Sequence, residues 1–402
     1  RSRKARPVRI ARRRLYTVRK HKEHVEMKIL FIGPYRQSDG WGNAAKEYIR
    51  ALSKVEGAEL AIRPIYMGSS YCDLEEDLLE YEFNDFREYD LVIQNVLPHL
   101  CEYNAKFKKN VILFYTESDN LQNTAWPSRV NLMDEAWVPS NQEKNNLKNS
   151  GVNIPIKVVP IPLNVNKFDL VGDSKVNIPG VGKDTFVFYT SGEFVQRKNT
   201  SALVSAFHSE FDRNEDVALV IKSNKAGLRP AELSNHMLQK FNGVKARLRL
   251  YPNASDYKNE IVVTEYLEEQ TLLALYNSCD CFVMPSHGES WCIPAMESMA
   301  LGKPCIVTSN TGMADFVTSK NGWVVKSQET IPMVKDAPLP DLYTGRESWR
   351  EINTIDLKKC MRRAFEDVNE FKKKSENCKK DTEQYSYENV SVLIKEVLDD
   401  CN

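Results

Sequence analysis

Short apolar runs that alternate with helix-like segments constrain the fold of this chain more than any other feature. Met27–Gly33 is the first such run, and a loop rich in small and polar residues separates it from the helical spacing of Ala44–Leu52. Runs of this length that end in Gly or Pro are typical of buried parallel strands. Further runs lie at 59–65, 90–96, 110–116, 135–138 and 157–161. We therefore expect a parallel sheet with helices on both faces.

The same alternation starts again after a stretch rich in Gly, Pro and Val that ends at Gly182. The second set of runs lies at 185–190, 217–222, 260–264, 281–284, 304–308 and 323–325, with helical patterns at 201–211, 268–278 and 293–301. Charged helical segments at about 353–375 and 387–399 close the chain. Because 402 residues are enough for two domains with separate cores, we expect an α/β protein with two doubly wound units, 27–168 and 169–384.

The zero net charge of the chain hides an uneven distribution of charge. Residues 1–26 contain eleven Lys and Arg residues against two Glu, whereas the remaining chain is acidic. This basic extension is interpreted as a solvated linker, with an arm that contacts anionic lipid or nucleic acid as the alternative; of these partners, nucleic acid is not favoured. Since the chain begins with Arg, the extension is also compatible with a piece of a larger multidomain protein.

Cysteine usage and hydropathy indicate a protein of the cytoplasm. The nine cysteines are scattered, and the pair Cys279 and Cys281 lacks the second pair that a zinc site needs, so we expect buried free thiols. No segment approaches the roughly 18 apolar residues that span a membrane, and no secretory signal is evident. A cytoplasmic location is expected, with peripheral membrane contact through residues 1–26 as the alternative.

The segment Met284–Val307 carries the strongest chemical signal. It leads from a predicted strand through a loop of small residues into a helix and on to the next strand. Ligands bind at the carboxyl ends of parallel strands, and a helix start offers unpaired N–H groups to an anion. Glu289 lies in the loop and Glu297 lies about two turns into the helix, so one carboxylate can reach a reacting sugar while the other accepts bonds from a ribose. This arrangement suits a sugar diphosphate.

Met284–Val307 resembles the retaining glycosyltransferases of family 4, whose signature is two glutamates separated by seven residues. Glu289 and Glu297 match this spacing, and Gly288, a proline in the first helical turn and the sequence Ala-Leu-Gly-Lys-Pro match its surroundings. The resemblance covers roughly residues 27–325. It implies a GT-B fold, in which two Rossmann-like domains face each other and a C-terminal helix, here 385–402, packs back on the first domain. The first domain would then bind the acceptor and the second the donor.

The resemblance also implies roles for particular residues. Arg197 and Lys198 match the basic pair that stabilises the departing nucleoside diphosphate, although Glu193 stands where many members carry Arg. The loop with Gly40 and Gly42 would approach the donor phosphates from the opposite side. Further donor contacts are expected from Tyr266 in the turn that holds the base, and from Gly288, Ser290 and Trp291 beside Glu289.

Three side chains of the first domain remain ambiguous. His99 occupies the region where the family often has a histidine near the donor sugar, with a structural or surface role as the alternative. Glu117 and Asp119 end a predicted strand, where they could meet the acceptor or cap a helix.

The resulting hypothesis is a hexosyltransferase that moves a sugar from a UDP- or GDP-sugar to a hydroxyl of a glycan or other acceptor, with retention of anomeric configuration. Glu289, Lys198 and His99 are the expected catalytic residues. Neither a cofactor nor a metal is expected, because no Asp-x-Asp motif is present. The alternatives are a sugar-nucleotide epimerase or a phosphorylase of the same fold, and a non-catalytic module that binds nucleotide sugars.

Overall fold

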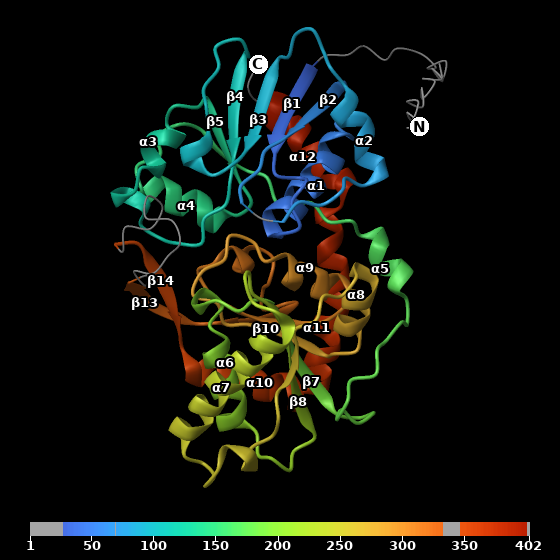
Figure 1. The fold of residues 1–402 in the computed structure, drawn as a ribbon, viewed down its shortest axis with the longest axis vertical. Helices are drawn as coiled ribbons and strands as arrows, with labels where there is room; N and C mark the ends of the chain where they lie inside the picture. The colour runs from blue at the N-terminus through green and yellow to red at the C-terminus, as the bar shows by residue number, and fades with distance from the viewer. Residues whose placement is uncertain (1–26, 69, 333–345, 400–402) are drawn as a thin grey trace, which may run out of the picture.

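The computed structural model describes residues 27–68, 70–332 and 346–399. Two α/β domains are stacked along the long axis of the molecule, the first above the second in Figure 1. The basic extension 1–26 lies outside the described residues, as does Cys401. The eight described cysteines are unpaired, and all except Cys72 are buried, as expected from the sequence.

The first domain contains one parallel sheet of six strands in the order β2-β1-β3-β4-β5-β6. These strands are β1 (Met27–Gly33), β2 (Ala58–Pro64), β3 (Leu91–Asn95), β4 (Lys109–Leu113), β5 (Glu135–Val138) and β6 (Ile156–Val158). The helices of this domain are α1 (Gly40–Leu52), α2 (Glu76–Phe83), α3 (Trp126–Val130) and α4 (Asn141–Asn149). The central strands β3 and β4 are almost wholly buried, because helices cover both faces of the sheet.

The second domain repeats this plan with the strand order β12-β11-β10-β7-β8-β9. Its strands are β7 (Phe186–Glu193), β8 (Val217–Asn224), β9 (Ile261–Val263), β10 (Cys281–Met284), β11 (Cys305–Thr308) and β12 (Gly322–Val325). Its helices are α6 (Thr200–Glu210), α7 (Pro230–Leu248), α8 (Glu269–Asn277), α9 (Ile293–Ala300), α10 (Thr354–Glu366) and α11 (Val368–Thr382). The prediction of two doubly wound units is confirmed.

Two features of the second domain differ from the sequence-based expectation. The helical segment expected at 353–375 is divided at Asp367, whose side chain accepts a hydrogen bond from the Glu370 amide and so caps a new helix. An antiparallel hairpin of β13 (Ser327–Pro332) and β14 (Ser348–Ile352) was not expected at all. Its strands are short and polar, so the sequence lacks the alternating pattern that marks a half-buried strand.

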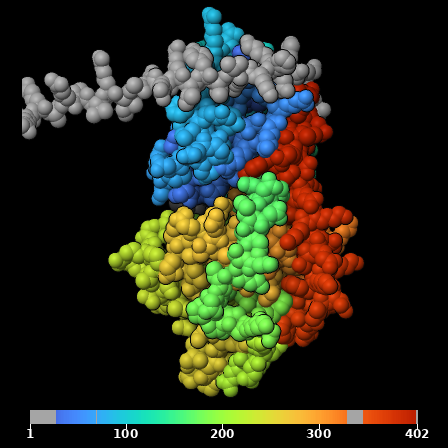
Figure 2. Space-filling model, turned by 90° about the vertical axis from the view of Figure 1, so that its right-hand side faces the viewer, coloured from blue at the N-terminus to red at the C-terminus, as the bar shows by residue number. Residues whose placement is uncertain are grey.

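The chain returns to the first domain at its C-terminus. Helix α11 packs on α9 in the second domain, whereas α12 (Tyr387–Asp399) packs on α1 in the first. The Leu163 amide donates to the Tyr385 carbonyl at 2.7 Å, and the Tyr387 hydroxyl donates to Glu47 at 2.7 Å. Figure 2 shows this C-terminal segment running along both domains beside the connection that contains α5 (Asn166–Val171). The expected crossover helix is confirmed.

No helix among the described residues is both long and apolar enough to cross a membrane.

Removing the buried face of α12 should loosen the first domain. Ile394 is fully buried and Val392 on the same helix is 59% exposed. We expect Ile394→Ala to lower the free energy of unfolding by about 2–5 kcal/mol, because it leaves a cavity against the core. Val392→Ala should change it by no more than about 0.5 kcal/mol. Urea unfolding of both variants is the measurement, and equal effects would contradict the packing of α12.

Candidate functional site

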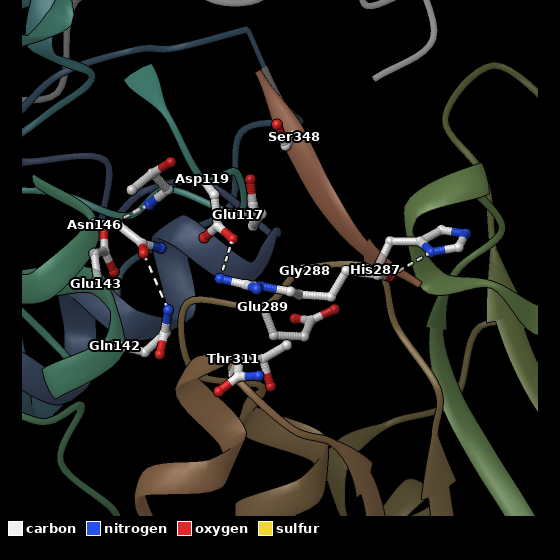
Figure 3. Close-up of a pocket in the computed structure, with 13 residues that line it drawn as sticks. Glu117, Asp119, Gln142, Glu143, Asn146, His287, Gly288, Glu289, Thr311 and Ser348 are labelled. Atoms are coloured by element: carbon white, nitrogen blue, oxygen red, sulfur yellow. Dashed lines mark hydrogen bonds and ion pairs between the residues drawn. The ribbon is translucent and has the colours of Figure 1, made fainter. Parts of the chain in front are cut away.

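A narrow pocket lies where the carboxyl ends of the strands of the two domains face each other. The loop between β10 and α9 carries Glu289, and the loop after β4 carries Glu117 and Asp119. Figure 3 shows Glu117, Asp119 and Glu143 on the side of the first domain, with His287 and Glu289 on the side of the second. This is the edge at which open parallel sheets bind ligands.

Glu289 accepts contacts from two cations. Lys198 Nζ and Arg197 Nη1 each lie 2.7 Å from Glu289 Oε1, and the Ser286 hydroxyl donates to the same oxygen at 2.9 Å. Burial by itself would raise the pKa of the Glu289 carboxyl, but Arg197 and Lys198 outweigh it and hold that pKa below its usual value. The two elements predicted from separate motifs therefore meet in one buried cluster.

Arg197 also joins the two domains. Its guanidinium donates to the Gly288 carbonyl at 2.7 Å and lies 3.2 Å from Glu117 Oε1. The pair Arg197–Lys198 lies in a single turn directly before α6, so its fixed charges stand beside a helix start. Charges and N–H groups that converge in this way can stabilise negative charge on a phosphate.

The residues next to Glu289 pack against the first domain. Gly288 lies so close to Glu117 that a Cβ atom would come within 1.9 Å of the Glu117 carbonyl oxygen. The Ser290 hydroxyl donates to Glu143, which also accepts from the Thr116 amide at 2.6 Å. Burial raises the pKa of Glu143 well above its usual value, despite the hydrogen bonds from Ser290 and Thr116. The contacts of Gly288 and Ser290 are thus interdomain contacts, and their predicted contact with a donor stays a prediction.

Trp291 is buried, with only 3% of its surface exposed. Its ring lies 4.8 Å from Phe316 and 5.3 Å from Tyr385, centroid to centroid. The packing accounts for the position of Trp291, and its role in donor binding stays a prediction.

Glu297 lies on α9 about one turn after the helix begins at Ile293, and not two turns as expected from the sequence. Its Oε1 atom is 2.8 Å from the Nζ atom of Lys167, which is also 2.9 Å from Glu269 Oε1. Lys167 belongs to α5, in the connection between the two sheets. The contact of Lys167 with Glu297 could not be predicted from the sequence, because a lysine in a polar connection carries no local signal for a contact with a residue 130 positions away.

Two predicted residues lie apart from this cluster. His99 is exposed in a short turn after β3, and Tyr266 is 82% exposed; neither lines the pocket. The structure therefore does not bring His99 to Glu289, and a catalytic role of His99 stays a prediction.

The two glycines before α1 have different surroundings. A Cβ atom on Gly42 would come within 2.0 Å of the Gln37 carbonyl, whereas a Cβ on Gly40 would meet nothing within 4 Å. Asp39 caps the helix by accepting from the Gly42 amide at 2.8 Å. Packing thus requires a glycine at position 42, and the predicted approach of both glycines to phosphate stays untested.

The hairpin β13–β14 connects the Glu289 loop with the first domain. Asp119 and Ser348 exchange backbone hydrogen bonds of 3.0 and 3.1 Å, and Arg350 lies 2.6 Å from the Asp119 carboxylate. The ring of His287 stacks on Trp349 at 5.4 Å. Asp119 is therefore held by the hairpin, and His287 shapes the loop that carries Glu289.

Within the described part of the chain, no group of three or more His, Cys, Asp or Glu side chains is arranged to hold a metal ion.

Comparison with known proteins finds similarity to glycosyltransferases. Residues 173–336 match the profile of the family Glycosyl transferases group 1. A segment of 81 residues is 30% identical to a serotype-specific mannosyltransferase of Escherichia coli; it makes up 20% of this chain and 9% of that protein. A segment of 87 residues is 34% identical to an uncharacterized glycosyltransferase of Methanocaldococcus jannaschii, covering 21% of this chain and 22% of that protein. The matches thus span less than a quarter of the length of these curated relatives.

Similar solved structures cover nearly the whole chain. Sucrose-phosphate synthase from Thermosynechococcus elongatus has a TM-score of 0.62 at 14% identity, over 94% of this chain and 99% of that one. Anabaena HepE in complex with UDP-glucose has a TM-score of 0.61 at 14% identity, over 93% and 100% of the two chains. This similarity establishes the GT-B fold that the sequence predicted. The assignment to family 4 stays a prediction.

The lowered pKa of Glu289 predicts how pH affects stability. A carboxylate whose pKa is lower in the folded state stabilises that state at pH values above its ordinary pKa of about 4.3. This contribution is lost as the pH falls through the lowered pKa of the folded state. We expect Glu289→Gln to cost about 3 kcal/mol of unfolding free energy at pH 7, and much less at pH 3. Urea unfolding at both pH values tests this, with Glu376→Gln on the exposed face of α11 as the control. A loss that is independent of pH would contradict the pKa direction.

Proposed function

We propose that this protein is a retaining glycosyltransferase that moves a sugar from a UDP- or GDP-sugar to a hydroxyl of a glycan or other acceptor. The observation that carries the proposal is the meeting of Lys198 with Glu289 at 2.7 Å, at the carboxyl edge of the second sheet. Both residues fall within the segment that matches the group 1 glycosyltransferases. The mannosyltransferase among the relatives and the UDP-glucose complex among the similar structures support a sugar nucleotide as the donor.

In the proposed reaction, the bond between the anomeric carbon and the diphosphate oxygen breaks while the acceptor oxygen forms a new bond on the same face of the sugar. The diphosphate leaves with its electron pair, and one of its oxygens takes the proton of the acceptor hydroxyl. Lys198 and Arg197 stabilise the charge that develops on the diphosphate. Because Glu289 and Glu117 contact these cations, the diphosphate would share or replace those contacts.

The remaining roles belong to the same proposal. Glu289 orients the donor sugar and Glu297 accepts hydrogen bonds from the ribose. Tyr266 would contact the base, and His99, Gly40, Gly42, Gly288, Ser290 and Trp291 would complete the donor site. Neither a metal nor a cofactor is required in this scheme, so activity should persist in excess EDTA.

Loss of either partner of the central ion pair should impair turnover. We expect Glu289→Gln and Lys198→Ala each to lower the release of nucleoside diphosphate from a sugar nucleotide about a hundredfold or more, since each loses one preorganised electrostatic contact. Glu376→Gln and Lys372→Ala, exposed on α11, serve as matched controls and should retain full activity. Near-normal activity of both cleft variants would refute the assignment. Binding of a sugar nucleotide without turnover by the wild type would instead identify a non-catalytic module.

The anomeric configuration of the product tests the same-face mechanism separately. Proton NMR of the first product should show the configuration of the donor, before any mutarotation. A product with the inverted anomer would exclude the proposed route while leaving sugar transfer itself intact.

A further inference from the structure

The connection between the domains contributes a charged side chain that contacts the second domain. Lys167, on α5, extends its ammonium group to Glu297 on α9 and to Glu269 at the start of α8, at 2.8 and 2.9 Å. The Lys167 side chain is 16% exposed and the Glu297 side chain 10%, whereas Glu269 is 66% exposed. The contact with Glu297 is therefore the buried one, and the contact with Glu269 is open to solvent.

The charges around Lys167 keep it protonated. Burial acts to lower the pKa of the Lys167 ammonium, but the carboxylates of Glu297, Glu269 and Glu47 outweigh it and raise that pKa above its usual range. A buried ion pair adds little stability compared with well-packed apolar side chains of similar size. A gain in stability is thus a weak explanation for the presence of the Lys167–Glu297 pair. A role in fixing the orientation of the Glu297 side chain explains it better.

Glu297 lies along α9 from the loop that carries Glu289. Arg197 and Lys198 stand near the Glu289 loop, and α9 begins at Ile293. At about 1.5 Å per residue, Glu297 lies about 6 Å along the helix from that start. A ligand whose phosphates contact the cations would reach Glu297 by extending along α9 in this direction.

We propose that Lys167 is a positioning residue for the nucleoside of the donor: it binds Glu297 Oε1, so that Glu297 Oε2 is oriented to accept from a ribose hydroxyl. This inference rests on the proposed function. It predicts that the nucleoside subsite is built jointly by the second domain and the interdomain connection, because α5 supplies the residue that orients Glu297.

Calorimetric titration with UDP, GDP and inorganic pyrophosphate tests the proposal, since pyrophosphate has no ribose. We expect Lys167→Met to weaken binding of the nucleoside diphosphate about tenfold or more, as for loss of a charge-assisted contact, and to leave pyrophosphate binding unchanged. Unchanged pyrophosphate binding also shows that the variant is folded. Lys167→Gln provides a second variant, and Lys167→Arg should restore most of the affinity.

Further variants show whether Lys167 acts through Glu297. The double variant Lys167→Met, Glu297→Gln should bind the nucleoside diphosphate no more weakly than Glu297→Gln alone. Glu269→Gln should bind nearly normally, because its contact with Lys167 is exposed. Lys358→Met is the control lysine, since Lys358 pairs with Glu210 at the end of α6 remote from Lys198.

The outcomes separate this inference from the function on which it rests. If the wild type binds UDP or GDP and Lys167→Met and Lys167→Gln bind it equally well, the inference is wrong and the proposed function stands. Equal weakening of pyrophosphate and nucleoside diphosphate would also overturn it, by showing a general effect on the cleft. If the wild type binds neither UDP nor GDP, the proposed function fails and the inference fails with it.

Discussion

The buried carboxylate of Glu289 and the two cations on it form the interaction on which the cleft depends. Taking three charged groups out of water is costly, and the cost is offset only when the contacts are short and additional hydrogen bonds satisfy the remaining atoms. Here Lys198, Arg197 and Ser286 all contact one carboxylate oxygen. Ionisable groups that are buried and perturbed by named partners in a cleft are typical of functional sites. The cluster therefore organises the loop after β10, and its two cations supply the charge on which the proposed diphosphate binding depends.

The same cluster depends on the first domain. Arg197 reaches Glu117, Gly288 packs on the Glu117 carbonyl, and Ser290 binds Glu143. The hairpin β13–β14 adds a second connection through Asp119 and Arg350. Because these contacts surround Glu289 on the side of the first domain, a change in the distance between the domains would alter the surroundings of its carboxylate. The helix α12 and the connection through α5 also join the two domains.

The packing of some predicted ligand residues has a purely structural explanation. Gly42 is required by the Gln37 carbonyl, and Trp291 fills a space between Phe316 and Tyr385. A motif can match a family in full while some of its residues stabilise the fold and do not contact the ligand. For these residues, a loss of activity on substitution has to be compared with a loss of stability before a role in binding is assigned.

The sequence by itself determined the two sets of strands and helices and the Glu289–Glu297 motif, because strand and helix periods and motif spacing are local properties of the chain; the crossover helix was implied only by the family resemblance. It also placed Arg197 and Lys198 at a helix start. Only the tertiary structure decided which side chains meet across the cleft: it brought Glu117, Glu143 and Lys167 to the site and left His99 on the surface. It also divided the helix at Asp367 and added the hairpin β13–β14. The meetings across the cleft and the hairpin depend on contacts between residues far apart in the sequence, which neither periodicity nor spacing encodes, whereas the division at Asp367 comes from a local cap.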